Sequence, residues 1–161
     1  MPAGSLSPAG GVLNAGGRLM KLTTRSRYGT RLALDIALHG ADGPVRIKDI
    51  ARRQGISVKY LEKLVRDLKQ AGFIISRRGP KGGHQLAKPQ DKISVGEIVS
   101  VLEGDLSLVD CVAESENCPR VADCMTRNVW VQAARAMSDK LHSITLAELV
   151  EKSRPCRPTD K

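Results

Sequence analysis

The sequence predicts a mostly α-helical protein with a small β wing, in which a winged helix-turn-helix domain is followed by a long C-terminal helix. Three observations predict this fold class. Residues 47–72 have the pattern of two amphipathic helices around a glycine turn, a basic glycine-rich hairpin follows them directly, and an amphipathic stretch spans residues 125–142. The 161 residues suffice for one domain with an extension.

The helix-turn-helix is predicted from the stretch IKDIARRQGISVKYLEKLVRDLKQAG, residues 47–72. Its apolar residues recur at helical spacing on both sides of a short break at residues 54–57. Gly55 can adopt the positive φ that ends the first helix, Ile56 can fill the angle between the helices, and Ser57 can cap the second helix. The alternative is an ordinary amphipathic hairpin with a solvated basic face.

The outer face of the second helix is basic. It carries Lys59, Lys63, Arg66 and Lys69. In helix-turn-helix proteins the first turns of the second helix meet base edges in the major groove. We therefore expect DNA contacts from Ser57, Lys59, Tyr60 and Lys63. Glu62 is either an acceptor for a cytosine amino group or a helix-surface partner for Arg66.

Charge is distributed unevenly along the chain, which has a formal net charge of +9. Residues 1–92 contain eighteen Lys and Arg against six Asp and Glu, a charge of +12, whereas residues 93–161 have eight against eleven, a charge of −3. The positive field therefore belongs to the half with the helix-turn-helix, as expected for a surface that binds phosphates. Because the sequence has one Phe, one Trp and two Tyr, its core must be aliphatic.

The N-terminal region divides into a tail and a helix. Residues 1–19 are rich in Gly, Ala, Ser and Pro and carry one charged residue, so we expect a disordered tail, which is either harmless or the product of an upstream start codon chosen wrongly. Thr23 or Thr24 can cap a helix that runs to about His39. Its apolar face is expected from Tyr28, Leu32, Leu34, Ile36 and Leu38. Arg25 and Arg27 in its first turns either touch phosphates or are solvated surface residues.

A two-stranded wing is predicted directly after the second helix. Residues 73–75 and 85–87 have the composition of short strands, and a glycine-rich basic loop joins them. Arg77, Arg78 and Lys81 are the candidates for minor-groove or phosphate contacts at this hairpin. A basic surface hairpin without a ligand is the alternative, although the position after a helix-turn-helix favours the wing.

Three further helices follow the wing. Ser94 and Glu97 form a capping box for a helix that ends at Gly104 and completes a winged domain over residues 20–104. Residues 125–142 predict a long amphipathic helix with an apolar face that includes Trp130, and a capping box at Thr145 begins a short helix. We assign these two helices to residues 125–153 and a flexible tail to residues 154–161.

Three cysteines lie close together in the acidic half. Cys111, Cys118 and Cys124 fall within fourteen residues, inside a loop that we place at residues 105–124. Thiols this dense suggest one shared site, which can bind zinc, carry an iron-sulfur cluster or react as thiols. The gaps of six and five residues are wider than the usual zinc spacing, so they fit a cluster better than a zinc knuckle, with reactive thiols and coincidence as the alternatives.

The charge around these cysteines favours a metal centre over a free thiolate. Residues 110–124 contain four acidic residues and one arginine, and negative neighbours raise the pKa of a thiol. A cationic centre would neutralise three clustered thiolates and give the loop a reason to order.

The sequence resembles the IscR/NsrR/CymR-type family of winged helix-turn-helix transcription regulators. The resemblance covers Met20 to about Glu151 and rests on MKLTTRSRYGTRLALDIA, ISVKYLEKLVRDLKQAGFI, RRGPKGGHQLA and the three-cysteine loop. It implies a homodimeric regulator that binds a palindromic operator in double-stranded DNA. Its iron-sulfur cluster, held by Cys111, Cys118 and Cys124, is expected to report on iron-sulfur supply, nitric oxide or redox state. The resemblance also assigns the long helix to the dimer interface, for which the candidates are Trp130, Met137 and Leu141.

Two positions depart from the family pattern. His84 stands in the wing where the family usually has Tyr, and Arg127 stands where relatives of the iron-sulfur biogenesis regulator place a histidine. The fourth ligand is therefore missing from its expected place. Substitutes are Asp123, Glu116, Asn128, a group from the partner subunit's first helix, or a small exogenous ligand, whereas Cys156 is more simply a free terminal thiol. We favour a 2Fe-2S cluster, with a 4Fe-4S cluster as the second option.

Other classes of protein are disfavoured. No apolar run approaches the roughly 20 residues of a membrane span, and no signal-type segment follows Met1, so we expect a cytoplasmic protein without a membrane partner. Three cysteines are too few for a ferredoxin-type set, and no nucleophile–base pair or phosphate loop is present, so an enzyme is not expected. The competing interpretation is a cluster-free regulator of the same fold that is controlled by reactive thiols or by a regulatory protein partner.

Overall fold

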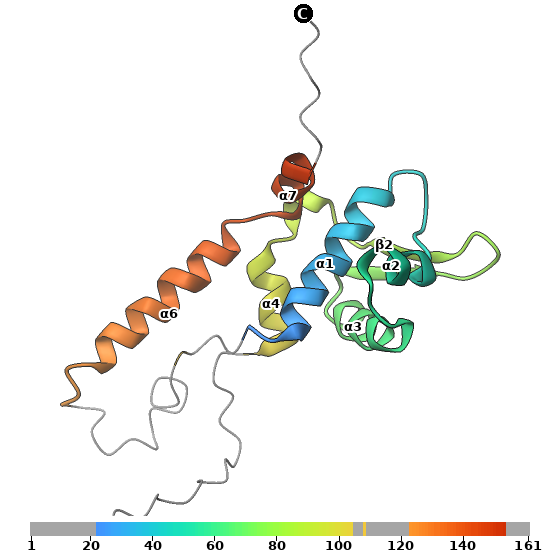
Figure 1. Ribbon diagram of the computed structural model, residues 1–161. Coiled ribbons are helices and arrows are strands. Elements are labelled where there is room, and N and C mark those ends of the chain that lie inside the picture. The colour runs from blue at the N-terminus through green and yellow to red at the C-terminus, as the bar shows by residue number, and fades with distance from the viewer. Residues whose placement is uncertain (1–21, 105–107, 109–122, 154–161) are drawn as a thin grey trace, which may run out of the picture.

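The computed structural model describes residues 22–104, 108 and 123–153 (Figure 1). Its elements are α1 (Thr24–His39), α2 (Ile47–Gln54), α3 (Val58–Gln70), β1 (Ile74–Arg77), β2 (Gly83–Leu86), the 3-10 helix η1 (Gln90–Lys92), α4 (Val95–Glu103), α6 (Arg127–His142) and α7 (Leu146–Ser153). One body contains the wing and all helices except α6, which extends away from it. The predicted fold class, mostly helical with a small β wing, is confirmed.

Local capping chemistry sets where the helices begin. Thr23 Oγ1 accepts from the Arg25 amide at 3.0 Å, so α1 starts at Thr24. At α4, Ser94 Oγ accepts from the Glu97 amide at 3.1 Å and the Glu97 carboxylate accepts from the Ser94 amide at 2.8 Å. This reciprocal pair is the predicted capping box, and the Ser94 amide is the main reason that the pKa of Glu97 is lowered.

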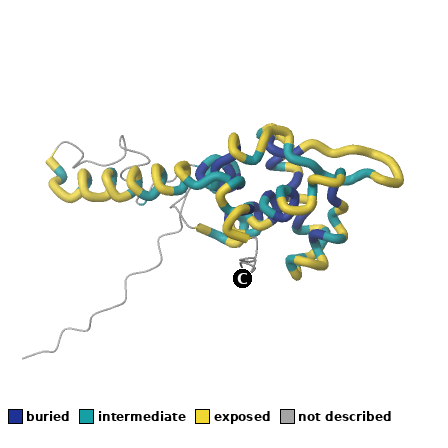
Figure 2. Tube along the Cα trace, turned by 90° about the horizontal axis from the view of Figure 1, so that it is seen from above, coloured by how far each residue is buried: buried dark blue, intermediate teal, exposed yellow. Residues whose placement is uncertain are grey.

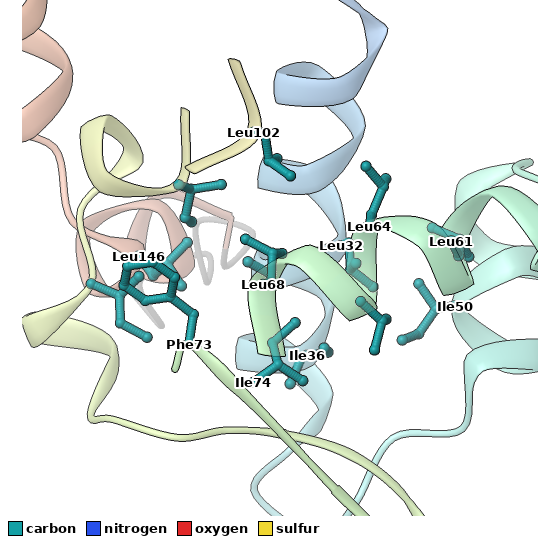
Figure 3. Close-up of a cluster of buried hydrophobic side chains, with 14 of the residues drawn as sticks. Leu32, Ile36, Ile50, Leu61, Leu64, Leu68, Phe73, Ile74, Leu102 and Leu146 are labelled. Carbon is teal, nitrogen blue, oxygen red and sulfur yellow. The ribbon is translucent and has the colours of Figure 1, made fainter. Parts of the chain in front are cut away.

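The core is aliphatic, as the composition predicted. Its largest members come from α1, α2, α3, α4, α7 and β1 (Figure 3), and among them are Leu32, Ile36, Ile50, Leu61, Leu64, Leu68, Ile74, Ile98, Leu102 and Leu146. Together they hold α3 against α1 and α4, which fixes the helix that is expected to meet DNA.

The apolar face of α1 differs from the prediction at its C-terminal end. Leu32 and Ile36 are fully buried, but Leu38 is 38% exposed. At about 100° per residue Leu38 lies roughly opposite Ile36 on the helix, so the two cannot face the same core. Ala33 is buried instead.

The wing strands are displaced from their predicted positions toward the hairpin tip. They pair in antiparallel register from Ile74 with Leu86 to Arg77 with Gly83, rather than over residues 73–75 and 85–87. Phe73 is buried in the core and lies between α3 and β1: its amide donates to the Leu68 carbonyl oxygen at 2.9 Å, and its own carbonyl oxygen accepts from the Ala87 amide at 2.9 Å. Arg77 is consequently a strand residue and not a loop residue.

The two C-terminal helices behave differently. α7 packs into the winged body, where Leu146 is fully buried and its amide donates to the Ile93 carbonyl oxygen at 2.9 Å. α6 has no fully buried residue and is an exposed rod in Figure 2. Its C-terminal end packs on α4 so closely that a Cβ on Gly96 would collide with the His142 ring. None of the described helices is both long enough and apolar enough to cross a membrane.

Candidate nucleic-acid interface

The turn between α2 and α3 has helix-turn-helix geometry at the residues that the sequence indicated. α2 ends at Gly55, whose φ of 65° lies in the left-handed region that favours glycine. The Ile56 amide donates to the Ala51 carbonyl oxygen at 3.1 Å, and the Ile56 side chain packs half-buried against the core. Ser57 Oγ then accepts from the Tyr60 amide at 3.3 Å and caps α3.

One face of α3 is basic and open to solvent. The buried face consists of Leu61, Leu64, Val65 and Leu68. The exposed residues include Lys59, Lys63, Arg66 and Lys69. None of these four cations forms an ion pair with another residue that the structure describes. Their charges are therefore available to an anionic ligand.

Tyr60 connects the first turns of α3 and α1. Its ring is half-buried and lies edge-on to the Tyr28 ring, with the ring centroids 6.0 Å apart at 84°. The guanidinium carbons of Arg27 and Arg31 lie 4.8 and 5.5 Å from the centroid of the Tyr28 ring. Two exposed arginines of α1 are thereby held beside the start of the basic helix.

A buried polar network fixes the end of α2 to α1. Asp35 of α1 is 2% exposed, and its carboxylate accepts from Arg53 Nε at 3.1 and 3.2 Å and from Gln54 Nε2 at 2.7 Å. Arg31 Nε donates to Gln54 Oε1 at 2.8 Å. Hydrogen bonding to Asp35 raises the pKa of Arg53 by more than burial lowers it, so Arg53 keeps its positive charge. This network positions the turn before α3 and was not predicted from the sequence.

The wing tip is attached to the start of α2. The Arg46 guanidinium donates to the Pro80 carbonyl oxygen at 2.6 Å, and Val45 forms an isolated bridge with His84 of β2. Arg77, at the end of β1, and Arg78 and Lys81, in the loop that follows, are all exposed. The three predicted wing cations thus lie together on a hairpin that is held at its base and at its tip. Arg46 was not predicted to take part.

His84 fills the space between the wing and α3. Its Nδ1 lies 3.0 Å from Ser76 Oγ, and the ring lines a hollow of about 340 Å³ together with Glu62 and Lys69. Burial lowers the pKa of His84 most, Lys69 lowers it further, and Glu62 opposes both. The ring is consequently neutral at physiological pH and adds no charge to this surface.

Arg25 has a carboxylate partner on the recognition helix. Its guanidinium donates to Asp67 Oδ2 at 2.7 Å, whereas the sequence had suggested only a phosphate contact or a solvated residue. Asp67 was not among the predicted site residues, because the two positions are 42 residues apart in sequence.

The start of α1 is also tied to the end of α4. Glu103 Oε1 accepts from Thr23 Oγ1 at 2.6 Å, from the Thr23 amide at 3.1 Å and from the Ser26 amide at 3.0 Å. Burial raises the pKa of Glu103, but these hydrogen bonds together lower it below its ordinary value. The last residue of α4, just before the cysteine-containing segment, therefore caps α1 with a charged carboxylate.

The predicted metal ligands are only partly within the described residues. Cys111 and Cys118 lie outside them, whereas Cys124 lies just before α6 with its Sγ 3.4 Å from Thr126 Oγ1. Among the described residues no group of three His, Cys, Asp or Glu side chains could hold a metal ion. Arg127 is no substitute for a histidine ligand, because a guanidinium group has donors but no acceptor atom. Three thiolates nevertheless suit iron or zinc chemically.

Several apolar side chains of α6 are left uncovered by the residues that the structure describes. Val129 is 58% exposed and Trp130 is 45% exposed, while Met137 and Leu141 are half-buried. Near its C-terminal end, Leu141 lines a mostly apolar groove of about 440 Å³. The other walls of this groove come from α1 and α4 and from Leu22, which precedes α1.

Comparison with known proteins places these features among regulators. The sequence profile of the Rrf2 family, described as iron-dependent transcriptional regulators, matches residues 22–152. The protein rrf2 of Nitratidesulfovibrio vulgaris (strain Hildenborough) is 56% identical over 137 residues, which cover 85% of this chain and 91% of that protein.

Two solved structures have the same fold. CymR, the global cysteine regulator of B. subtilis, matches with a TM-score of 0.72 and 33% identity over 84% of this chain and 99% of that one. IscR of T. potens matches with a TM-score of 0.71 and 34% identity over 88% of this chain and 94% of that one. The similar proteins are transcription regulators and not enzymes.

Proposed function

The chain belongs to the Rrf2 family of winged-helix transcription regulators, and on this premise we propose that it binds a palindromic operator as a homodimer under the control of an iron-sulfur cluster. DNA binding and transcription regulation come with the family. The dimer, the cluster and its signal are the parts that the proposal adds. The observation that carries it is the basic face of α3, which has no ion-pair partner among the described residues and lies beside a basic wing.

Base reading is assigned to the start of α3. Lys59 and Lys63 project from its exposed face and can donate to guanine edges in the major groove. Ser57 Oγ already accepts from the Tyr60 amide, but its hydroxyl proton remains available for a base or a phosphate. The Tyr60 ring packs on Tyr28, so we assign its contact to the phenol oxygen alone.

The wing supplies the backbone contacts. Arg77, Arg78 and Lys81 are exposed on a hairpin that Arg46 restrains at the tip, which favours insertion into a minor groove or clamping of phosphates. Arg78→Ala should weaken binding on all sequences and reduce the salt slope by roughly 0.9 for each phosphate that the protein no longer neutralises. An unchanged slope would show that Arg78 does not touch phosphate.

The dimer is assigned to α6. Its exposed apolar side chains have no buried neighbour in their own helix, and a second copy can cover them. Trp130 is the proposed anchor, with Met137 and Leu141 nearer the winged body. The apolar groove beside Leu141 supports the same assignment, since it joins α6 to α1 and α4 in one continuous surface.

The cluster is assigned to Cys111, Cys118 and Cys124, as a 2Fe-2S or, second, a 4Fe-4S centre. When bound, it supplies iron that oxidants or nitric oxide can reach, which suits a sensor of iron-sulfur status, redox state or nitric oxide. The three thiols lie between Glu103, which ends α4, and Arg127, which begins α6. Fixing them at one centre would set the pose of α6 relative to the winged body.

That pose determines how two recognition helices meet DNA. Half-sites of a palindrome are about one helical turn apart, roughly 34 Å, and both α3 helices have to match this spacing together. A changed pose of α6 would shift the protein between matched and mismatched arrangements. The regulator has to act in the compartment that holds its DNA, which we take to be the cytoplasm.

Two measurements test the proposal. The full chain, purified without oxygen, should show visible absorption with bound iron and sulfide, and Cys111→Ala, Cys118→Ala and Cys124→Ala should each abolish it, whereas Cys156→Ala should not. Selection from random duplexes should yield a palindrome whose affinity differs between the wild type and these variants. Wild-type absorbance and affinity in the triple variant would overturn the sensing part.

The alternative function is a cluster-free regulator controlled by reactive thiols or by a partner protein. The arginine at position 127 favours it, and among the solved structures the similarity to CymR, a cysteine regulator, is as close as that to IscR. A colourless oxygen-free preparation that still selects a palindrome would support this alternative. Treating that preparation with an oxidant then separates thiol control, which changes affinity, from partner control, which does not.

A further inference from the structure

The ion pair between Arg25 and Asp67 places a carboxylate on the recognition surface, where it competes with DNA phosphates for the Arg25 guanidinium. The Arg25 guanidinium, in the first turn of α1, reaches Asp67 Oδ2 on α3 at 2.7 Å. We infer that Asp67 withholds Arg25 from the phosphate backbone and so lowers the sequence-independent affinity of this surface for duplex DNA. The inference rests on the proposed DNA-binding function and names a residue that regulates its strength.

Arg25 stands where a phosphate would be attracted. It lines an open hollow of about 380 Å³ between the start of α1 and the outer face of α3. The other lining residues are Tyr60, Lys63, Leu64, Arg66 and Asp67. Three cations and a phenol around one hollow suit a phosphodiester anion, and Asp67 is the carboxylate in this lining that opposes it.

The energetics of α1 alone do not account for a cation at this position. The first turn of a helix carries partial positive charge, so a positive side chain there is unfavourable. α1 has no acidic residue in its first turn to compensate Arg25. Glu103 on α4 accepts from the backbone amides at this helix end, but the carboxylate that binds the Arg25 guanidinium itself is Asp67 on α3, which makes the pairing a property of the DNA-facing surface.

The pair is exposed enough to exchange partners. The Arg25 side chain is 43% exposed and that of Asp67 is 33% exposed, in contrast to Asp35, which is 2% exposed in its pair with Arg53. Exposed pairs are weak, so a phosphate can compete for Arg25 but has to displace a carboxylate to do so. The resulting decrease in affinity should be no more than about fivefold.

The test uses the full chain and a labelled duplex of random sequence over a series of salt concentrations. Asp67→Asn keeps the shape of the side chain but frees Arg25, so binding should tighten about two- to fivefold and the salt slope should steepen by up to roughly 0.9. Asp91→Asn is the matched control, because Asp91 pairs with Lys92 at 3.6 Å on η1 and its replacement changes the net charge equally. Asp91→Asn should increase the affinity for the duplex less than Asp67→Asn does.

A second pair of variants tests the route through Arg25. Arg25→Ala alone should change binding far less than Lys63→Ala, since Asp67 already occupies the guanidinium. When Arg25 is already replaced by Ala, Asp67→Asn should produce little of the increase in DNA affinity that it produces in the wild type. These two results keep the inference testable even if Asp67→Asn does not fold, which thermal unfolding of each variant checks.

The results distinguish failure of this inference from failure of the proposed DNA-binding function. If the wild type binds duplex but a folded Asp67→Asn variant binds no more tightly, or if Arg25→Ala weakens binding as much as Lys63→Ala, the inference fails while the proposed function stands. If the wild type binds neither random nor selected duplex, the proposed function fails and this inference with it. Tighter binding in Asp67→Asn that disappears without Arg25 establishes the competition.

Discussion

Asp35 on α1 binds Arg53 on α2 through both of its carboxylate oxygens, with Nε–O distances of 3.1 and 3.2 Å, although Asp35 itself is only 2% exposed. A buried charge of this kind is stable only while its partner stays in place. The turn that leads into the recognition helix therefore depends on one ion pair in the core of the domain.

Replacing Asp35 should destabilise the winged domain strongly. Asp35→Ala should lower the free energy of unfolding by about 3 kcal/mol, because it removes the buried acceptor of the charge-assisted hydrogen bonds from Arg53 and Gln54. Urea unfolding followed by circular dichroism measures this loss. Asp49→Ala is the control, since Asp49 pairs with Arg52 at 3.4 Å on the exposed side of α2, and its effect should be below about 1 kcal/mol. Equal losses would contradict the structural role of Asp35.

Glu103→Gln should change how stability depends on pH. Because hydrogen bonds hold the pKa of Glu103 below its ordinary value of 4.5, its contribution is present above that value and is lost as the pH falls through the folded-state pKa. The variant should be about 1–2 kcal/mol less stable at neutral pH and should lose less on acidification. Unfolding curves across the pH range test this, with Glu148→Gln on α7 as the control for removal of an exposed carboxylate. If the free energy of unfolding had the same pH dependence in Glu103→Gln as in the wild type, the proposed role of the Glu103 carboxylate would be refuted.

Arg46→Ala should loosen the wing. Without the hydrogen bond to the Pro80 carbonyl oxygen, the tip should sample more conformations, and operator affinity should fall about two- to fivefold. The salt slope should stay constant, because Arg46 acts by positioning and not by binding phosphate. In an Arg78→Ala background, Arg46→Ala should reduce operator affinity by less. Arg52→Ala on α2 serves as the control. A slope that falls with Arg46→Ala would instead identify a phosphate contact.

Trp130→Ala should weaken the dimer without unfolding the chain. An interface anchor of this kind contributes about 2 kcal/mol or more, which corresponds to roughly a thirtyfold rise in the dimer dissociation constant. The melting temperature of the winged body should change little, because α6 has no fully buried residue. Sedimentation equilibrium measures the constant, and Arg135→Ala, at an 83% exposed position of α6, is the control. An unchanged dimer would remove α6 from the interface.

Features that depend on neighbouring residues were predictable from the sequence. Gly55 ends α2 in the left-handed region, Ser57 caps α3, and Ser94 forms the capping box of α4, each at the expected position. In all three cases the chemistry acts within four residues, so the local sequence contains what is needed.

Features that depend on distant partners were not predictable. No partner for Arg25 could be identified from its neighbours because Asp67 is 42 residues away, and nothing local distinguishes Asp35 from an exposed aspartate. The start of β1 was also missed, because the Phe73 amide bonds to the Leu68 carbonyl oxygen of α3 and does not join the strand ladder. Cys111 and Cys118 lie outside the described residues, so the metal site stays a prediction.

Because α7 packs onto the winged body, the chain cannot be shortened freely from its C-terminal end. Because Leu146 fills the core and the Val95 amide donates to the Ile144 carbonyl oxygen at 2.8 Å, a fragment that stops after α4 would leave a hole where α7 belongs. Helices α4 and α7 therefore belong to one body, although α6 lies between them in the sequence. A minimal DNA-binding unit should retain residues 144–153.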